Sequence, residues 1–423
     1  MKRIVQTLIA LALTFLLVQA SWYSYLFKGV YATYLQGHTT SNIFDGASFD
    51  QGPVLAPNPQ PWPVALDLSY APSDALQTLL TEIETGALLI FTRDTLRYED
   101  YDHKVSPESK TNSFSMAKSI VTMLVQVAIQ EGKIPSWDAK AIDYLPMLQG
   151  PGAEKLTLKN LSAMTADLDW NEDYYNPFGI TAKAYFGKDL FATTTHCAVG
   201  AEVGQRYEYQ SGATALLGFC LESATGMKVN EYASAKLWGP MGATSDAFWH
   251  LDDSGNALTY CCFNATARDY GRLGKLLLQN GRWNGEVLVD STFLYTASTP
   301  GLEAFYGYSF WLGSVGAPEG ELWEAPVSYV AYRGHLGQWI VAVPDRDMII
   351  VRTGHQEGGG DREKGLPSSF VQTVTEYVQR DFSRQTFALG EEFSTDDSPE
   401  LADDKRILGE ESDALPITDS SDI

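Results

Sequence analysis

A serine and a lysine stand three positions apart at the start of a long apolar run. The segment reads Ser115-Met116-Ala117-Lys118, and the apolar residues continue to Ile129. A segment that is apolar on nearly every face predicts a helix buried at the centre of a domain. Residues at positions i and i+3 share one face of a helix, so Ser115 and Lys118 would lie side by side.

A charged lysine in the first turn of a buried helix is costly unless it is paired or neutral. Burial and the positive end of the helix both lower the pKa of such a lysine. A lysine that is neutral near pH 7 can act as a general base, and a serine needs such a neighbour to become a nucleophile. Spacing alone also allows a helix-capping serine followed by a lysine that extends its stem along the surface.

The elements that must position this pair are strands near both ends of the body and helices between them. Residues 86–101 predict two strands around a charged turn, and residues 339–354 predict a hairpin. We expect these strands to be neighbours in one antiparallel sheet. Helical patterns lie between them, over 115–131, after Tyr209 and over 265–281. The fold class predicted is α+β, an antiparallel sheet flanked by helices plus a helical subdomain.

Three short motifs resemble those of one enzyme superfamily. They are Ser115-Met116-Ala117-Lys118, Tyr209-Gln210-Ser211 and His335-Leu336-Gly337, in this order. They resemble the S-x-x-K, Tyr-x-Ser/Asn and Lys-Thr-Gly or His-x-Gly motifs of serine β-lactamases and penicillin-binding proteins. The resemblance covers about residues 61 to 385 and implies a β-lactamase/transpeptidase-like fold.

The resemblance points to the class C-like branch, with family VIII carboxylesterases and 6-aminohexanoate-oligomer hydrolases. The stretch "LSAMTADLDWNEDYYNP" at 161–177 is similar to the "DW.E.Y" loop of the latter. The tyrosine of that loop assists the leaving amide, which implies this role for Tyr174, with Tyr175 as the adjacent alternative. From residue type alone, Glu172 and Asp173 are expected to be a solvated pair on this loop.

The resemblance also implies a mechanism. Ser115 would attack a carbonyl carbon and form an acyl-enzyme, Lys118 would take the serine proton, and Tyr209 would relay a proton to the leaving group. The lysine and the tyrosine would titrate as a pair. The backbone N–H groups of Ser115 and Gln338 would form the oxyanion hole.

The remaining site residues implied by the resemblance would bind substrate: His335, Gly337, Tyr174 and Ser211. His335 stands where β-lactamases carry a lysine that helps to bind the carboxylate of the antibiotic. Histidine is largely neutral near pH 7, which disfavours an antibiotic hydrolase. Arg333 could compensate only if it points into the cleft.

No metal or organic cofactor is expected. The histidines show no HExxH or paired spacing, and the cysteines form no CxxC pair. An even number of cysteines permits disulfides in an exported protein without fixing a pairing, and buried thiols are equally compatible with the sequence. The four cysteines are Cys197, Cys220, Cys261 and Cys262.

The net charge of −23 disfavours nucleic acid and anionic membrane surfaces as partners, because like charges repel phosphate. A small neutral or cationic ester or amide suits this charge better. Residues 391–423 hold 12 acidic and two basic residues. Such a segment has too few large apolar residues to offset its ordering entropy, so a disordered tail is predicted.

The N-terminus predicts export. Residues 4–27 follow Lys2 and Arg3 and carry no charge. An uncharged segment of this length can cross a bilayer. A cleavage site at Val18-Gln19-Ala20 would make it a removed signal peptide. The length of the apolar run and the aromatic residues after it favour a retained anchor instead, with the membrane contacted through this helix only.

The sequence therefore predicts four segments: 1–28 as signal anchor or signal peptide, 29–60 as an extended lead-in, 61–385 as the hydrolase domain and 386–423 as an acidic disordered tail. The predicted function is a serine hydrolase that cleaves an ester or amide. One alternative is β-lactamase or DD-peptidase activity on antibiotics or cell-wall peptides. Another is a catalytically silent ligand-binding scaffold, whose signature would be the loss of Ser115, Lys118 or Tyr209. The oligomeric state is left open.

Overall fold

The structure is a computed structural model that describes residues 2–19, 21, 23–65, 72–316, 326–357 and 367–392. The chain divides into two units, residues 1–379 and 380–423. Helix α12 (Ser368–Glu392) supplies the end of the first unit and the described part of the second. Helix α12 therefore extends past residue 386, where the predicted tail begins. Residues 393–423 lie outside the described residues.

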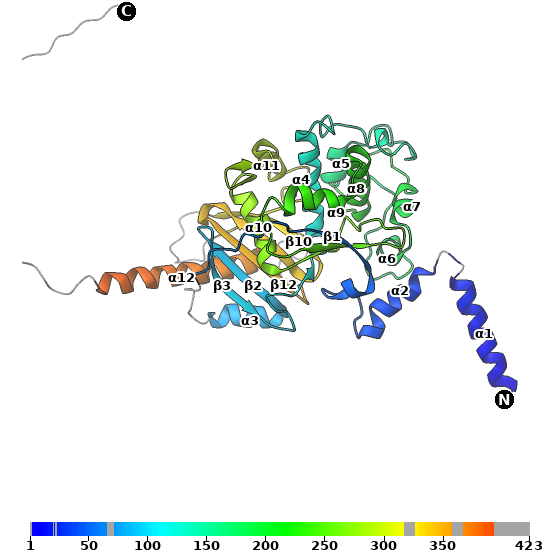
Figure 1. The fold of residues 1–423 in the computed structure, drawn as a ribbon, viewed down its shortest axis with the longest axis horizontal. Helices are drawn as coiled ribbons and strands as arrows, with labels where there is room; N and C mark the ends of the chain where they lie inside the picture. Colours follow the sequence, from blue (N-terminus) through cyan, green and yellow to red (C-terminus); the bar gives the residue numbers. More distant parts are fainter. Residues whose placement is uncertain are drawn as a thin grey trace, which may run out of the picture. The chain divides into compact units, whose positions relative to one another are not determined.

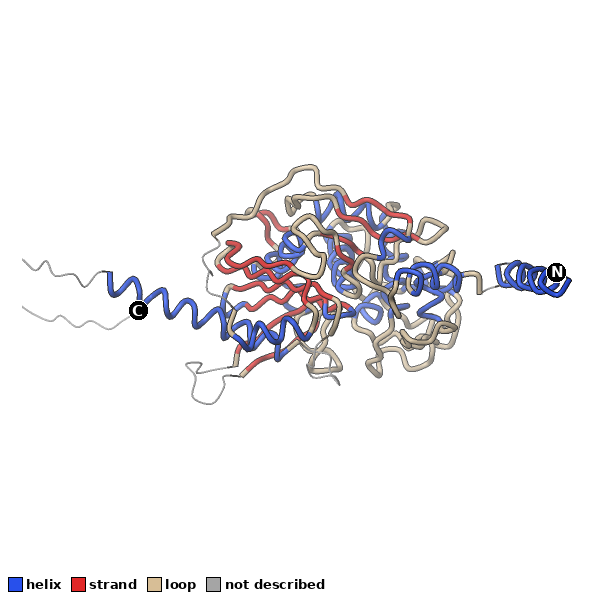
Figure 2. The backbone as a smooth tube through the Cα atoms, turned by 90° about the horizontal axis from the view of Figure 1, so that it is seen from below, coloured by secondary structure: helices blue, strands red, loops and turns tan. Residues whose placement is uncertain are grey.

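The larger sheet joins segments from both ends of the body. Its six antiparallel strands run in the order β3 (Thr95–Tyr101), β2 (Thr85–Thr92), β12 (Met348–Gly354), β11 (Gln338–Val343), β10 (Val327–Gly334) and β9 (Trp311–Val315). Figure 2 shows these strands side by side. Strands β2, β11 and β12 are buried along their whole lengths, which explains their continuous apolar sequences. Both predicted strand pairs are confirmed, and Ile90 of β2 pairs directly with Ile350 of β12.

Helices cover this sheet and form the helical part of the molecule (Figure 1). Helix α10 (Ala267–Leu278) packs on β2, β11 and β12, whereas α4 (Met116–Gln130) contacts both β10 and helix α8 (Ser211–Thr225). The three predicted helices are therefore confirmed, and α4 is buried along nearly its whole length. The other helices of the body are α3 (Asp74–Glu82), α5 (Leu158–Ser162), α6 (Ile180–Phe186), α7 (Leu190–Thr195), α9 (Val229–Ala233) and α11 (Ser291–Ala297).

A smaller antiparallel sheet leads into the candidate site. It has the order β1 (Asp50–Val54), β5 (Ala247–Leu251), β6 (Phe263–Ala265) and β4 (Thr111–Asn112). Strand β4 ends three residues before Ser115, so pairing with β6 fixes the approach of the chain to the motif. A separate two-stranded ribbon consists of β7 (Arg282–Trp283) and β8 (Glu286–Val287).

The extended lead-in predicted for 29–60 is wrong. Helix α2 (Tyr25–Ala32) packs against α6, and β1 pairs with β5 along all five of its residues. The segment is rich in turn-forming residues, but Ile43, Phe49 and Val54 are buried. Burial of these side chains supplies the free energy that orders the segment.

Helix α1 (Lys2–Gln19) precedes α2. Within the described residues it is the one helix long and apolar enough to span a membrane, with a mean hydropathy of 1.4. The shorter apolar helix α4 is a buried core helix.

Candidate active site

A left-handed residue sets the position of Ser115. Phe114 has φ of 45°, and its N–H donates to Oδ1 of Asn112 at 2.9 Å. Ser113 N–H meanwhile bonds to the carbonyl of Phe263 in β6. The chain therefore turns sharply out of the small sheet, and Ser115 becomes the N-cap of α4. Among the described residues, Ser115 N–H has no hydrogen-bond acceptor. An N–H group without an acceptor can donate to an oxyanion on a bound substrate.

Lys118 lies one turn further along and is fully buried. Its Nζ donates to Ser115 Oγ at 2.9 Å, to Ser211 Oγ at 3.1 Å and to the carbonyl oxygen of Tyr260 at 2.8 Å. Burial lowers the pKa of Lys118 to about 8, although the negative charge of Glu172 acts in the opposite direction. A substantial neutral fraction near pH 8 suits this amine to accept the serine proton.

Tyr209 completes the group around Ser115. Its ring centroid lies 4.9 Å from Lys118 Nζ, and its ring packs against Trp311 and Tyr306. Burial raises the pKa of the Tyr209 hydroxyl, and a hydrogen bond with Ser115 partly opposes that shift. Tyr209 is therefore a neutral phenol near pH 7, able to donate or pass on a proton beside the serine.

Glu172 anchors the polar network behind the lysine. Its carboxylate accepts hydrogen bonds from Ser211 N–H at 2.8 Å, Ser211 Oγ at 2.5 Å, Trp170 Nε1 at 2.6 Å and the Tyr174 hydroxyl at 2.6 Å. The expectation of a solvated acidic pair is wrong for Glu172 and fits only the exposed Asp173. A loop residue gives no periodic signal in the sequence, so only the fold reveals this contact.

Ser211 joins Glu172 to Lys118. Its hydroxyl donates to the carboxylate and accepts from Lys118 Nζ, so both functions of the hydroxyl are in use. The start of α8 comes this close to the loop because Gly212 has no side chain: a Cβ there would lie 2.5 Å from the Trp170 ring. The predicted residue Ser211 also lines the cavity at Ser115.

The structure distinguishes between the two adjacent tyrosines. Tyr174 donates to Glu172, and its ring centroid lies 5.6 Å from that of His335. Desolvation of the Tyr174 hydroxyl at its bond to Glu172, together with the negative charge of Glu172, raises the pKa of that hydroxyl well above its ordinary value. Both tyrosines border the cavity, and Tyr174 is 45% exposed whereas Tyr175 is 81% exposed. Tyr174 is thus the tyrosine that the fold joins to the Lys118 network.

The third motif forms a tight turn between β10 and β11. Leu336 and Gly337 have φ of 59° and 74°, and a Cβ on Gly337 would lie 2.3 Å from Arg352 Nη1. The buried Arg352 donates to the carbonyls of Leu336 at 2.8 Å and Gly337 at 2.6 Å. Gln338 Nε2 donates to the carbonyls of His335 and Gly354, which ties the turn to β12. Arg352 is a positioning residue that the motif pattern did not indicate.

His335 faces the cavity as a neutral ring. Burial lowers its pKa, and its ring packs edge-on against Phe114 with 5.4 Å between centroids. Arg333 does not compensate for the missing lysine of the motif. It forms an ion pair with Glu357 and lies over the Trp311 ring, 4.8 Å from its centroid.

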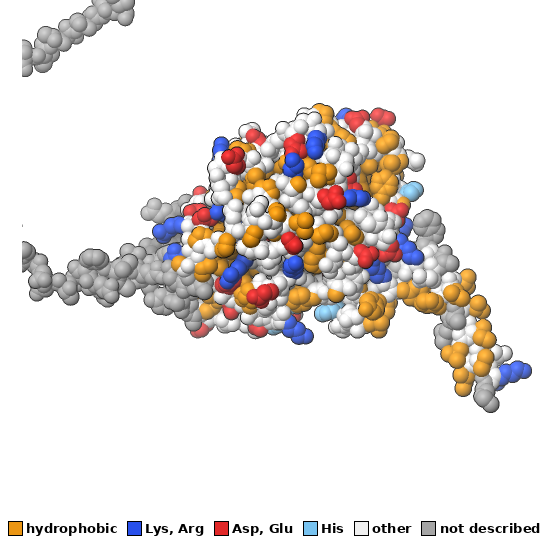
Figure 3. Space-filling model, viewed as in Figure 1, with side chains coloured by type: hydrophobic (Ala, Val, Ile, Leu, Met, Phe, Trp, Pro, Cys, Tyr) orange, Lys and Arg blue, Asp and Glu red, His pale blue; other side chains and the backbone are white. Residues whose placement is uncertain are grey.

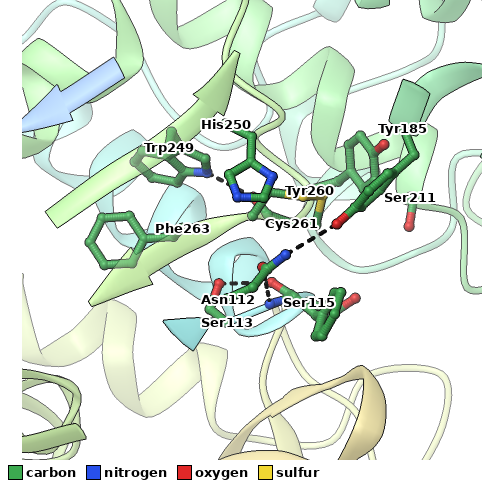
Figure 4. Close-up of a disulfide and its surroundings, with 12 residues drawn as sticks. Asn112, Ser113, Ser115, Tyr185, Ser211, Trp249, His250, Tyr260, Cys261 and Phe263 are labelled. Atoms are coloured by element: carbon green, nitrogen blue, oxygen red, sulfur yellow. Dashed lines mark hydrogen bonds between the residues drawn. A yellow bond between two sulfur atoms is a disulfide. The ribbon is translucent and has the colours of Figure 1, made fainter. Parts of the chain in front are cut away.

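A disulfide between adjacent cysteines borders the site (Figure 4). Cys261 and Cys262 are joined, and Cys262 has a positive φ of 70°. Trp249 Nε1 donates to the Cys261 carbonyl at 2.8 Å, so β5 holds the pair from one side. The preceding residue is Tyr260, whose carbonyl accepts from Lys118. Cys197 and Cys220 are buried free thiols.

A cavity of about 250 Å³ opens at Ser115. The predicted residues Ser115, Ser211, Tyr174 and His335 line it. Gly337, in the turn, and Gln338, the first residue of β11, lie outside that lining. In the described part of the chain, no three histidine, cysteine or acidic side chains converge as a metal site.

The family model "Beta-lactamase" matches residues 74–369. The chain belongs to the beta-lactamase family. This match contains all three motifs together with the Trp170–Tyr174 loop.

A curated relative is the 6-aminohexanoate-dimer hydrolase of Paenarthrobacter ureafaciens, 26% identical over 226 residues. That match covers 49% of this chain and 57% of the relative, so it spans little more than half of the relative's length.

Solved structures share the fold. A protein from Bacillus anthracis assigned as a 6-aminohexanoate-dimer hydrolase has a TM-score of 0.63 at 21% identity, covering 81% of this chain and 92% of its own. A penicillin-binding protein from Bacillus halodurans has a TM-score of 0.53 at 16% identity, covering 67% and 96%. These structures bear out the predicted class of fold, helices around antiparallel sheets.

Proposed function

We propose that this protein is a serine hydrolase that cleaves an ester or amide through an acyl-enzyme on Ser115. The observation that carries the proposal is the contact between Lys118 Nζ and Ser115 Oγ at 2.9 Å, in a site where burial lowers the lysine pKa to about 8. A neutral amine in this position can accept the serine proton as the oxygen attacks a carbonyl carbon.

The remaining residues supply the other steps. The N–H groups of Ser115 and Gln338 would stabilise the developing oxyanion, and Tyr209 would pass the proton from Lys118 to the leaving alcohol or amine. Water then attacks the acyl carbon, and the serine regains its proton. Tyr174 is hydrogen-bonded to Glu172 and lines the cavity, so it would assist a leaving group bound there.

Amide or ester cleavage is favoured over antibiotic hydrolysis because no cation lines the cavity within the described residues. His335 is held neutral, and Arg333 is paired with Glu357. The curated relative is named for hydrolysis of 6-aminohexanoate dimer. A dimer of an amino acid is joined by an amide bond, which supports the same reaction class.

The test is turnover of p-nitrophenyl acetate, 6-aminohexanoate dimer and a penicillin by the full chain. We expect turnover of the ester or the amide, at least 1,000-fold lower in Ser115→Ala. Ser119→Ala removes a buried serine of the same helix, bonded to the Ser309 carbonyl, and serves as the matched control. Equal activity of wild type and Ser115→Ala would refute the proposal, and turnover of the penicillin alone would favour the antibiotic alternative.

A further inference from the structure

The cavity at the nucleophile extends along helix α2. Leu26, Gly29 and Val30 of α2 line the same cavity as Ser115 and Ser211. Its described lining contains no lysine, arginine, aspartate or glutamate, and its one histidine is held neutral by burial. Hydroxyls of Thr33, Thr39, Thr40 and Ser41 also line this end, beside the apolar wall of α2. The part of the cavity next to α2 is therefore suited to an uncharged, mainly apolar chain rather than to a charged group.

Exposed apolar side chains lie on the two segments that border the cavity, residues 23–35 and the 174–178 loop, and we call them the rim. Tyr34 and Tyr175 among them line the cavity itself. Tyr23 and Phe178 pack together with 6.1 Å between ring centroids, which brings the start of α2 and the 174–178 loop together. The Tyr25 hydroxyl also donates to the Pro177 carbonyl at 3.1 Å. Figure 3 shows hydrophobic side chains on the surface in the region of α2. The rim consists of Tyr23, Tyr31, Tyr34, Leu35, Tyr175 and Phe178, each at least half exposed.

The part of the rim at α2 carries almost no charge. Between Arg3 and Asp45 the sequence contains one lysine or arginine, Lys28, and no acidic residue. Lys28 is paired with Asp253 at 3.3 Å and lies over the Phe49 ring. An exposed, uncharged group of aromatic and aliphatic side chains beside a cavity is typical of a contact with a lipid surface.

The connection to α1 places this surface near a membrane. Helix α1 ends at Gln19 and α2 begins at Tyr25, so five residues separate them. Five extended residues span at most about 18 Å. With α1 inserted as an anchor, Tyr23 and the first turn of α2 stay within that reach of the lipid headgroups. Tyrosine is the residue type that membrane interfaces favour.

We infer that the substrate is an amphiphile of the membrane surface, an ester or amide of a long-chain fatty acid. Its acyl chain lies along α2 and its carbonyl carbon reaches Ser115. Ser115 Oγ bonds to that carbon, the C–O or C–N bond breaks, and the leaving alcohol or amine takes the proton. Water then releases the fatty acid. This inference rests on the proposed function and adds the substrate class to it.

The experiment measures acyl-chain preference with the full chain in phosphatidylcholine vesicles. We expect kcat/KM for p-nitrophenyl dodecanoate to exceed that for p-nitrophenyl acetate at least tenfold. Val30→Trp places a large ring in the α2 wall and should lower this ratio at least tenfold. Val287→Trp, on β8, is the matched control: Val287 is 47% exposed against 44% for Val30, and lies outside the cavity. It should keep the wild-type ratio.

The outcomes separate this inference from the proposed function. Fluorophosphonate labelling of Ser115 is measured in the same samples. If Ser115 is labelled but both esters are cleaved at equal rates, the substrate class is wrong and the hydrolase proposal stands. The same holds if Val30→Trp leaves the ratio of the two kcat/KM values unchanged. Absence of both labelling and turnover in folded protein overturns both. If Val30→Trp fails to fold by circular dichroism, Leu26→Trp on the same wall replaces it.

Discussion

Ser115, the proposed nucleophile, is in contact with Lys118, the proposed base. Burial lowers the proton affinity of Lys118. Three acceptors surround Lys118 Nζ, namely two serine hydroxyls and the Tyr260 carbonyl. None of these is an anion, so they satisfy the amine without fixing its charge. Glu172 contributes its negative charge from the far side of Ser211 and limits how far the lysine pKa falls.

The pH dependence of activity follows from the Lys118 pKa of about 8. A base must be neutral to accept a proton, so kcat/KM should rise about tenfold per pH unit below pH 8 and level off above it. The apparent pKa belongs to the lysine and Tyr209 together. Lys118→Arg keeps the charge at all these pH values and should abolish activity. A rate independent of pH between 6 and 8 would contradict a base of this kind.

Glu172→Gln tests the anion behind the lysine. Removing the negative charge should lower the pKa of Lys118, because that charge raises it, and so move the ascending limb of the pH profile below pH 8. We expect kcat to fall about tenfold as well, because Ser211 loses a charged acceptor. Asp173→Asn removes the same charge from the exposed neighbouring residue and should leave the profile in place. A profile shifted equally in both variants would indicate a general charge effect.

At the scale of elements, the site is assembled where α4, α8 and the β10–β11 turn meet. The sequence predicted α4, α8 and both strand pairs because their apolar runs are long and are bounded by turn residues. It also predicted that Ser115 and Lys118 share a face, since one helix carries both. Glu172 and Arg352 were missed because a loop and a distant strand bring them to the site, and no local pattern encodes such contacts.

The Cys261–Cys262 disulfide should support the Lys118 site. Bonding two adjacent residues restricts the backbone that follows Tyr260, whose carbonyl accepts from Lys118. We expect reduction by dithiothreitol to lower kcat severalfold, reversibly on reoxidation, with mass spectrometry verifying the bond. The Cys261→Ser/Cys262→Ser variant should have lowered activity that dithiothreitol no longer changes. Unchanged activity after verified reduction would show that the disulfide does not support the site.

The whole molecule is strongly acidic, but its cavity at Ser115 is lined by uncharged side chains. The sequence indicated export and a membrane helix, but it did not reveal that α2 becomes part of the cavity wall. Turn-rich composition suggested an extended lead-in, whereas burial of a few apolar side chains orders that segment. Local propensity does not predict this kind of stabilisation, because it depends on contacts with distant parts of the chain.

We predict that the mature protein keeps helix α1 as a membrane anchor. We expect the expressed full chain to remain in the membrane fraction after carbonate extraction, because 18 residues of predominantly apolar helix bind lipid strongly. Intact mass should show the N-terminal segment in place. A mature chain beginning at Ser21 and found free of membrane would identify the segment as a signal peptide. A chain that lacks residues 1–20 gives the reference mass expected for the cleaved protein.

Intact-protein mass spectrometry after exposure to a fluorophosphonate tests directly whether Ser115 is the nucleophile. We expect one adduct on the wild type, mapped to Ser115 by peptide sequencing, and formed faster as the pH rises towards 8. Ser115→Ala should show no adduct, whereas Ser119→Ala should react like the wild type. An adduct on another serine, or equal labelling of wild type and Ser115→Ala, would contradict the assignment of Ser115 as the nucleophile.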